Sequence, residues 1–178
     1  MVERLGLFTI IVFGECVLGV INGGSHIELN GWSDWLSFAA GILVVFALWW
    51  IFFSLIADRE CRPGFLQANL VQITYAFTLG SLGIIGASFT GLFSIDGTED
   101  ITRAGFGVAL CLFLWGIVAL SGLLLYPSEY DNAKKNVRIL LIAAGMAQLL
   151  LTFVISLSPG SYLGLTLGLL IFIIVMIT

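Results

Sequence analysis

The sequence predicts an all-α protein that crosses a membrane about six times as a bundle of helices. The first observation is composition: 60% of the 178 residues are hydrophobic and only 10% are charged, whereas soluble domains carry about 25% charged residues. A water-soluble fold needs polar residues over its outside, and a bilayer removes that requirement. The second observation is that the apolar residues form long runs, and the third is that the segments between them have the composition of turns.

Six apolar runs have the length that a membrane-spanning helix needs, which is about 20 residues for a hydrocarbon core about 30 Å thick. They lie near residues 5–22, 35–57, 67–92, 104–126, 138–156 and 161–177. The connections are short and rich in Gly, Pro, Asn, Asp and Ser. The chain therefore forms a single transmembrane domain, and any function must be built from the spans and their tight turns.

The basic residues predict how the spans are oriented. Six of the seven Lys and Arg fall on one side of the spans, and Arg103 falls on the other. The six are Arg4, Arg59, Arg62, Lys134, Lys135 and Arg138. By the positive-inside rule their side is cytoplasmic, which places both termini in the cytoplasm. Trp32, Trp35 and Tyr162 are then expected at the outer interface as part of an aromatic belt, and Tyr126 at the inner one.

Several classes of function find no support in the sequence. The net charge of −4 argues against nucleic acid as a partner. Cys16, Cys61 and Cys111 lie far apart and His26 is the single histidine, so neither a metal site nor a disulfide framework is indicated. The chain lacks the phosphate-binding loop, the G-x-S-x-G elbow and the H-E-x-x-H motif. The sequence thus points to no enzyme class and identifies no cofactor.

Glu15 is the most informative single residue. Of the 7 basic and 11 acidic side chains, it alone lies deep within a predicted span, about 15 Å beyond Leu5. An ionised carboxylate near the bilayer midplane costs several kcal/mol unless it is paired, hydrated or protonated, so we expect its helix face to turn inward. At 100° per residue that face also contains Arg4, Phe8, Ile11, Gly19 and Asn22.

Two roles for Glu15 remain open at this point. An intramembrane acid often marks an ion pathway, which would make Glu15 a proton-relay or cation-binding group. A protonated acid that is hydrogen-bonded to a neighbouring helix would instead hold the bundle together.

Polar side chains also recur at helical spacing in two other predicted spans. The third span contains Gln72, Thr78 and Ser81, and the fifth contains Gln148 and Thr152. Such stripes are typical of hydrogen bonds between membrane helices, worth about 0.6 to 2 kcal/mol per contact. The same residues could instead line a wet path across the membrane.

Three glycines recur at every third residue of the third span: Gly80, Gly83 and Gly86. The absence of side chains lets two helix backbones approach closely, so we expect Gly83 to lie at a helix contact. The alternative is a flexible hinge or a broken helix that exposes backbone carbonyls.

Two segments of the sequence resemble a known family. Residues 3–15 read E-R-L-G-L-F-T-I-I-V-F-G-E, and Trp49 and Trp50 open a second segment, W-W-I-F-F. The first run closely resembles the E-R-x-G-L-F-T-I-I-x-x-G-E signature of the bacterial low temperature requirement A (LtrA) family, and the second is similar to the W-W-x-Y-F segment that follows in that family. The matching signature positions are Glu3, Arg4, Gly6, Leu7, Phe8, Thr9, Gly14 and Glu15. The chain departs from the family at Phe52, where Tyr is usual, at Ser54, where an acid is frequent, and at Asn69, where His is common.

The resemblance implies a polytopic inner-membrane protein. Family members are longer and carry the signature near mid-chain, so the sequence resembles their C-terminal half and is expected to need a partner within the bilayer. We therefore expect a non-enzymatic subunit or accessory protein of a membrane assembly, either a homo-oligomer or a larger complex. The alternative is a small proton- or cation-coupled transporter or channel that uses Glu15 with Gln72 and Gln148. An intramembrane enzyme is a more distant alternative, because no pair of nucleophile and base is evident.

The orientation can be tested with the native cysteines. Cys61 lies in a predicted cytoplasmic connection, so impermeant thiol reagents should label it only from the cytoplasmic side. Cys16 and Cys111 lie within spans and should be protected in intact membranes. Labelling of Cys61 from outside intact cells would reverse the predicted orientation.

Overall fold

The computed structural model describes residues 2–25, 31–56, 59, 63–93, 99–125, 131–154 and 158–177. Within these ranges the chain forms six helices, each with a stretch that is long and apolar enough to cross a membrane. They are α1 (Val2–Ser25), α2 (Trp32–Ile56), α3 (Phe65–Leu92), α4 (Glu99–Leu123), α5 (Asp131–Val154) and α6 (Pro159–Ile177). The predicted all-α membrane bundle with six spans is confirmed.

Helices α4 and α5 begin before the apolar runs that predicted them. α4 starts at Glu99 and α5 at Asp131, whereas the runs begin near residues 104 and 138. The apolar run reports the part of a helix that crosses hydrocarbon, and a helix can continue with polar residues into the headgroup region. The hydropathy pattern thus locates the membrane core better than the helix ends.

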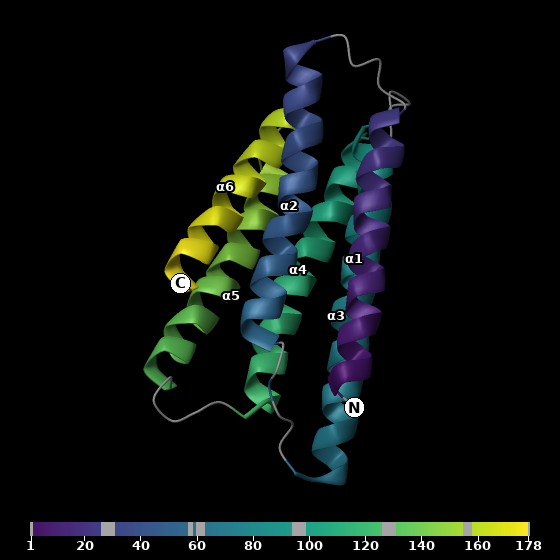
Figure 1. Cartoon of the computed structure of the whole chain (residues 1–178). Helices are drawn as coiled ribbons and strands as arrows, with labels where there is room; N and C mark the ends of the chain where they lie inside the picture. Colours follow the sequence, from purple (N-terminus) through teal and green to yellow (C-terminus); the bar gives the residue numbers. More distant parts are fainter. Residues whose placement is uncertain are drawn as a thin grey trace.

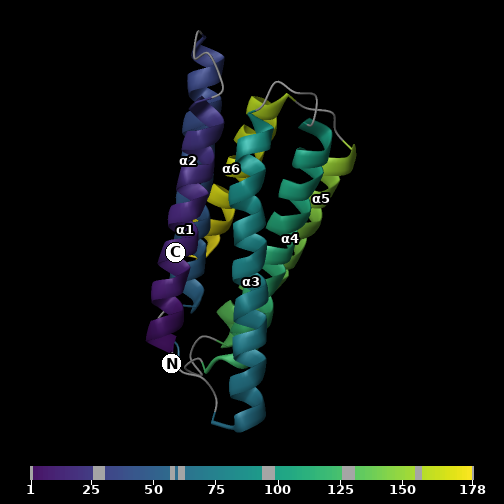
Figure 2. The ribbon, with the colours of Figure 1, turned by 90° about the vertical axis from the view of Figure 1, so that its right-hand side faces the viewer.

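The bundle is organised around α3 and α4, which pack against each other along their length. α1 covers α3, α5 covers α4, and α6 packs on α2, which also contacts α1 and α4. Successive helices run in alternate directions, so α1 begins and α6 ends toward the same end of the bundle (Figure 1). The two views place α1 and α5 on opposite sides of the molecule (Figures 1 and 2).

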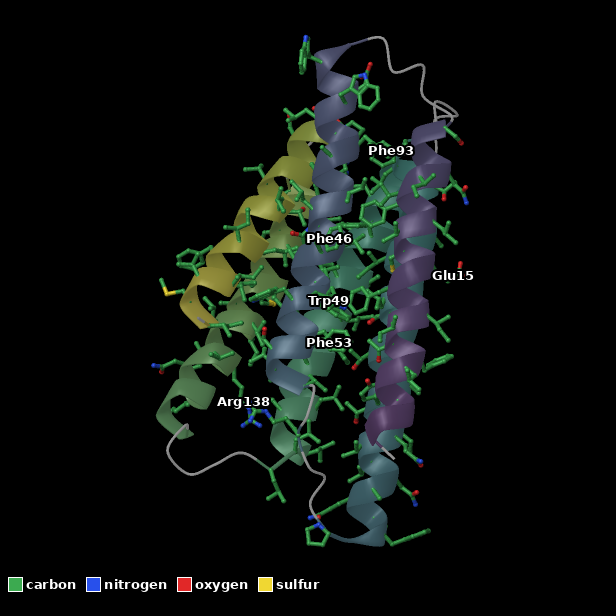
Figure 3. The ribbon with its side chains drawn as sticks, in the orientation of Figure 1. Glu15, Phe46, Trp49, Phe53, Phe93 and Arg138 are labelled. Carbon is green, nitrogen blue, oxygen red and sulfur yellow. The ribbon has the colours of Figure 1, made fainter. Side chains whose placement is uncertain are left out.

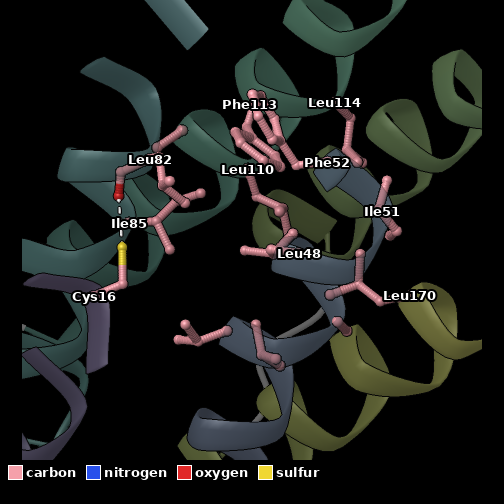
Figure 4. Close-up of a cluster of buried hydrophobic side chains, with 14 of the residues drawn as sticks. Cys16, Leu48, Ile51, Phe52, Leu82, Ile85, Leu110, Phe113, Leu114 and Leu170 are labelled. Atoms are coloured by element: carbon pink, nitrogen blue, oxygen red, sulfur yellow. Dashed lines mark hydrogen bonds between the residues drawn. The ribbon is translucent and has the colours of Figure 1, made fainter. Parts of the chain in front are cut away.

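Aromatic rings from four helices meet in the centre of the bundle. The ring of Phe52 in α2 lies 6.2 Å from Phe13 in α1, 5.7 Å from Tyr75 in α3 and 6.1 Å from Phe113 in α4, measured between centroids. All four side chains are buried. Figure 4 shows Phe52 and Phe113 among the buried leucines of α2 and α4. Edge-on and offset ring contacts of this kind favour defined orientations, so the cluster fixes how the four helices are rotated.

The closest helix contact joins α1 to α3 at two glycines. Gly19 lies directly against the backbone of Gly86, and a Cβ atom added at Gly86 would lie 3.1 Å from the Cα atom of Cys16. A Cβ atom added at Gly80 or Gly83 would meet nothing within 4 Å. The prediction that Gly83 lies at a helix contact is therefore wrong. Residues three apart on a helix diverge by about 60° in direction, so of these three glycines only Gly86 faces α1.

The predicted aromatic belt is only partly reproduced. Trp32 and Trp35, at the start of α2, are exposed by 92% and 53%. Tyr162 is completely buried inside the bundle, so its side chain is not part of a lipid-facing aromatic belt. Its hydroxyl is hydrogen-bonded to polar side chains of α5, which removes the need to reach water. Tyr126, like Cys61, lies outside the described residues.

The α1–α3 contact predicts different outcomes for two neighbouring glycines. Gly86→Leu should lower the thermal stability in detergent, because the new side chain forces α1 away from α3 at an overpacking cost of about 1–3 kcal/mol. Gly83→Leu places the same side chain one turn earlier on an open surface and should leave the melting temperature nearly unchanged. Equal melting temperatures for the two variants would contradict the contact.

Candidate functional site

The residues of the LtrA-like signature lie on α1, and one face of this helix packs against α3. Thr9 is buried, and its hydroxyl lies 2.6 Å from the hydroxyl of Tyr75. About two helical turns further along both helices, the Cys16 thiol donates to the backbone carbonyl of Leu82 at 3.2 Å. These bonds run the length of the α1–α3 contact, so they determine which side of α1 is turned inward.

The opposite side of α1 carries Glu15. Its side chain is exposed and points away from the other helices (Figure 3). Phe8 and Ile11 are 54% and 62% exposed, and Asn22 is exposed as well. The prediction that this face turns inward is therefore wrong for the single chain. Gly19 was predicted to share the face of Glu15, and it is the exception, because it is buried against Gly86.

The physical reason for this rotation is the size of the residues on α1. The inward side offers Gly19 and the small side chains of Thr9 and Cys16, which allow the backbones of α1 and α3 to approach. Turning Glu15 inward would rotate these residues away from Gly86 and break the bonds to α3. Backbone contact is the stronger constraint in hydrocarbon, where apolar side chains gain little from leaving lipid.

The remaining signature positions contribute to the outer surface of α1. Leu7 is 65% exposed. Gly6 and Gly14 have open space where a Cβ atom would stand. Glu3 and Arg4 lie within α1, and their side chains are outside the described part of the structure. The signature thus combines an inward hydrogen-bonding position, Thr9, with outward positions around Glu15.

The tryptophan segment divides in a similar way between the core and the surface. Trp49 and Trp50 are 39% and 48% exposed on α2, and the ring of Trp49 lies 5.1 Å from that of Phe53. Phe52 is buried in the central aromatic cluster. Of the positions that depart from the family, Ser54 is exposed on α2. Asn69 is half-buried on α3.

The polar residues of α3 serve different purposes. Thr78 and Ser81 are buried, and their hydroxyls donate to the α3 carbonyls of Thr74 and Thr78 at 2.8 and 2.7 Å. Gly116 of α4 packs directly on the Thr78 side chain. Gln72 is exposed on α3. For Thr78 and Ser81 the arrangement favours helix packing over a wet path, because both hydroxyls are used within the helix.

A buried polar cluster joins α5 to α6. The side-chain amide of Gln148 donates to the Tyr162 hydroxyl at 2.8 Å and to the Thr166 hydroxyl at 3.1 Å. The Tyr162 hydroxyl also lies 2.9 Å from that of Thr152. All four side chains are buried. Because these polar side chains are hydrogen-bonded to one another, the cluster stabilises the α5–α6 contact.

Two members of this cluster, Tyr162 and Thr166, were not recognised from the sequence. A signal was present: Gln148 and Thr152 are four residues apart on one helix, and Tyr162 and Thr166 are four residues apart on the next. Pairs at this spacing lie on one helix face. Two such pairs on helices joined by a short connection indicate a shared polar contact.

A further polar contact links α4 and α5. The half-buried Arg138 donates from Nε to the Ser121 hydroxyl at 3.0 Å. Figure 3 shows Arg138 near the end of the bundle where α1 begins. It is one of the basic residues that predicted the orientation of the spans.

The residues of the transporter hypothesis do not come together within one chain. Glu15 is on the outer surface of α1, whereas Gln148 is buried between α5 and α6 on the other side of the bundle (Figures 1 and 2). The α1–α3 contact pairs Thr9 with Tyr75, so Gln72 is level with Gly6, about 14 Å from the level of Glu15. No common site for the three residues follows from this arrangement of the described helices.

The α5–α6 cluster predicts a coupled effect on stability. Tyr162→Phe removes the hydroxyl that accepts from Gln148 and should destabilise the protein by about 1–3 kcal/mol, because a buried amide donor loses its partner. Its melting temperature in detergent measures the loss. When Gln148→Leu is also present the orphaned donor is gone, so the combined loss should be smaller than the sum of the two single losses. Additive losses would show that the two side chains are not coupled.

Comparison with known proteins agrees with the signature on α1. The family model described as Bacterial low temperature requirement A protein (LtrA) matches residues 1–178. No curated protein and no solved structure matches the chain significantly. The family match covers every helix of the bundle and includes the run around Glu15. The chain belongs to the bacterial low temperature requirement A (LtrA) family.

Proposed function

We propose that the chain is a non-enzymatic subunit or accessory protein of a larger assembly in the bacterial inner membrane, with both termini in the cytoplasm. The observation that carries the proposal is the position of Glu15. It is exposed on the outer surface of α1, in the middle of a helix that is long and apolar enough to cross a membrane.

The depth of Glu15 makes contact with lipid alone unfavourable. It lies ten residues from each end of the Leu5–Ser25 span, which corresponds to about 15 Å in both directions. That distance places it at the centre of a hydrocarbon core about 30 Å thick. Within the described part of the chain Glu15 has neither a hydrogen bond nor an ion pair. Protein that covers this side of α1 would supply the missing partner.

The hydrogen bonds in the rest of the bundle support a non-enzymatic role. The buried hydroxyls of Thr78, Ser81 and Tyr162 are hydrogen-bonded within or between helices, where they stabilise packing. An enzyme needs a nucleophile and a base within hydrogen-bond reach of each other and of a substrate. In this proposal the polar groups of the bundle hold helices together, and the outer side of α1 is the part left for a partner.

The alternative is a proton- or cation-coupled transporter or channel that uses Glu15. The position of Glu15 supports this alternative as well, since an acid at mid-span on an outer surface could line a path formed between subunits. In that case the carboxyl group must change its charge during transport, whereas in the accessory role it remains a hydrogen-bonding group.

Three variants separate the two functions. When membranes are extracted in polymer-bounded lipid discs, wild type and Glu15→Gln should both occur in discs that hold more protein than one chain of 19.2 kDa, because Gln keeps the hydrogen-bonding capacity of a neutral acid. Glu15→Leu should shift most of the protein to single chains. The mass distribution of the discs, measured by mass photometry and compared with that of empty discs of the same lipid and polymer, reports the protein mass per disc.

The same proteins in liposomes test for transport. The accessory role predicts no proton or cation flux above that of empty liposomes for any of the three. Wild type found as single chains in native discs would contradict the assembly. Flux in wild type that is lost in an otherwise stable Glu15→Gln protein would replace the accessory role by the transporter.

A further inference from the structure

We infer that the partner on α1 is a second copy of this chain, and that the two copies associate in parallel through the face formed by Phe8, Ile11, Glu15, Leu18 and Asn22, here called the α1 outer face. The inference rests on the proposed function, because it names the occupant of the surface that the proposed function requires. It depends on three features of that face: its spacing, its polar residues and its open flank.

The α1 outer face has the spacing of a coiled-coil seam. Phe8, Glu15 and Asn22 are each seven residues apart, and Ile11 and Leu18 fall between them with alternating steps of three and four. All five side chains are exposed in the single chain. Residues with this spacing remain on one line along two helices that wrap around each other, and each fits between residues of the facing helix.

The two polar residues select an identical helix as the partner. Copies of one chain insert into a membrane in the same direction, so a two-fold symmetric contact brings residues of equal number together at equal depth. Glu15 would then meet Glu15 of the second copy, and Asn22 would meet Asn22. A protonated carboxyl group and a side-chain amide each donate and accept hydrogen bonds, so each is complementary to itself. A polar residue at such a position fixes the register of two paired helices.

Other surfaces of the chain fit this pattern less well. A matching helix must present polar groups at two depths, seven residues and hence about 10 Å apart. The outer side of α2 presents Phe46, Trp49 and Trp50, which suit lipid. Gln72 on α3 is level with Gly6, because Thr9 pairs with Tyr75, and is thus far from the depth of Glu15. α1 itself supplies both groups at the right depths.

The flank of the α1 outer face leaves room for a close neighbour. Gly14 precedes Glu15 and is exposed, and a Cβ atom added there would meet nothing within 4 Å. A small residue beside the seam lets a second helix approach, which strengthens both dispersion contacts and the hydrogen bonds of the polar pair. The opposite side of α1 is held by α3, so pairing through the outer face requires no change in the bundle.

Cysteine cross-linking tests the contact directly. In a Cys61→Ser background, Ile11→Cys places a thiol on the seam, and Ile10→Cys places one on the neighbouring residue, which is 53% exposed but points about 140° away from Glu15. A disulfide requires Cβ atoms about 3.5–4.5 Å apart. Mild oxidation in native membranes should therefore cross-link Ile11→Cys into dimers at least about tenfold more than Ile10→Cys. Cys16 and Cys111 are buried and common to both variants.

A second measurement separates this inference from the proposed function. Two differently tagged copies should be recovered together from polymer-bounded discs, and Glu15→Leu in both copies should reduce that recovery at least about tenfold, whereas Glu15→Gln should retain it. Absence of co-recovery, together with discs that hold more protein than one chain, would overturn the second copy while the proposed assembly stands. Particles of one chain would overturn both. Equal cross-linking of the Ile10→Cys and Ile11→Cys variants would overturn the α1 outer face as the contact.

Discussion

The contact between the backbones of α1 and α3 is the constraint on which the surface of this protein depends. In hydrocarbon, apolar side chains gain little by leaving lipid, so helices are held together by close packing and by hydrogen bonds. Gly19 and Gly86 allow the closest approach, and the bonds of Thr9 and Cys16 to α3 extend it along the helix. Once α1 is fixed in this rotation, Glu15 can only point outward.

The polar side chains of the bundle differ in whether they have a hydrogen-bond partner within the chain. Gln148 and Tyr162 are buried, and their hydrogen bonds are completed inside the chain by Thr152 and Thr166. Glu15 lies at the middle of the Leu5–Ser25 span and has no such partner within the described chain. This contrast between the α5–α6 cluster and Glu15 supports the proposal that further protein covers the outer side of α1.

The arrangement of α1 gives a structural role to residues of the LtrA family signature. One part of the signature, Thr9, belongs to the contact that positions α1. Another part, Glu15 with the open Gly14 beside it, belongs to the surface that α1 presents. The signature is thus a single helix with an inward and an outward side, which agrees with a role in assembly better than with a reaction centre enclosed by one chain.

The sequence by itself determined the class of protein, the number of spans and the depth of Glu15, because apolar runs and their lengths record what a bilayer demands of a helix. Only the tertiary structure decided the rotation of α1, the neighbour of Gly86 and the burial of Tyr162. The face of α1 that carries Glu15 does not show which way the helix turns, because a partner for the acid can come from the same chain or from another one. That choice is made by the fit of small and hydrogen-bonding residues on two particular helices, such as Gly19 on Gly86, and one sequence does not reveal which helices are paired.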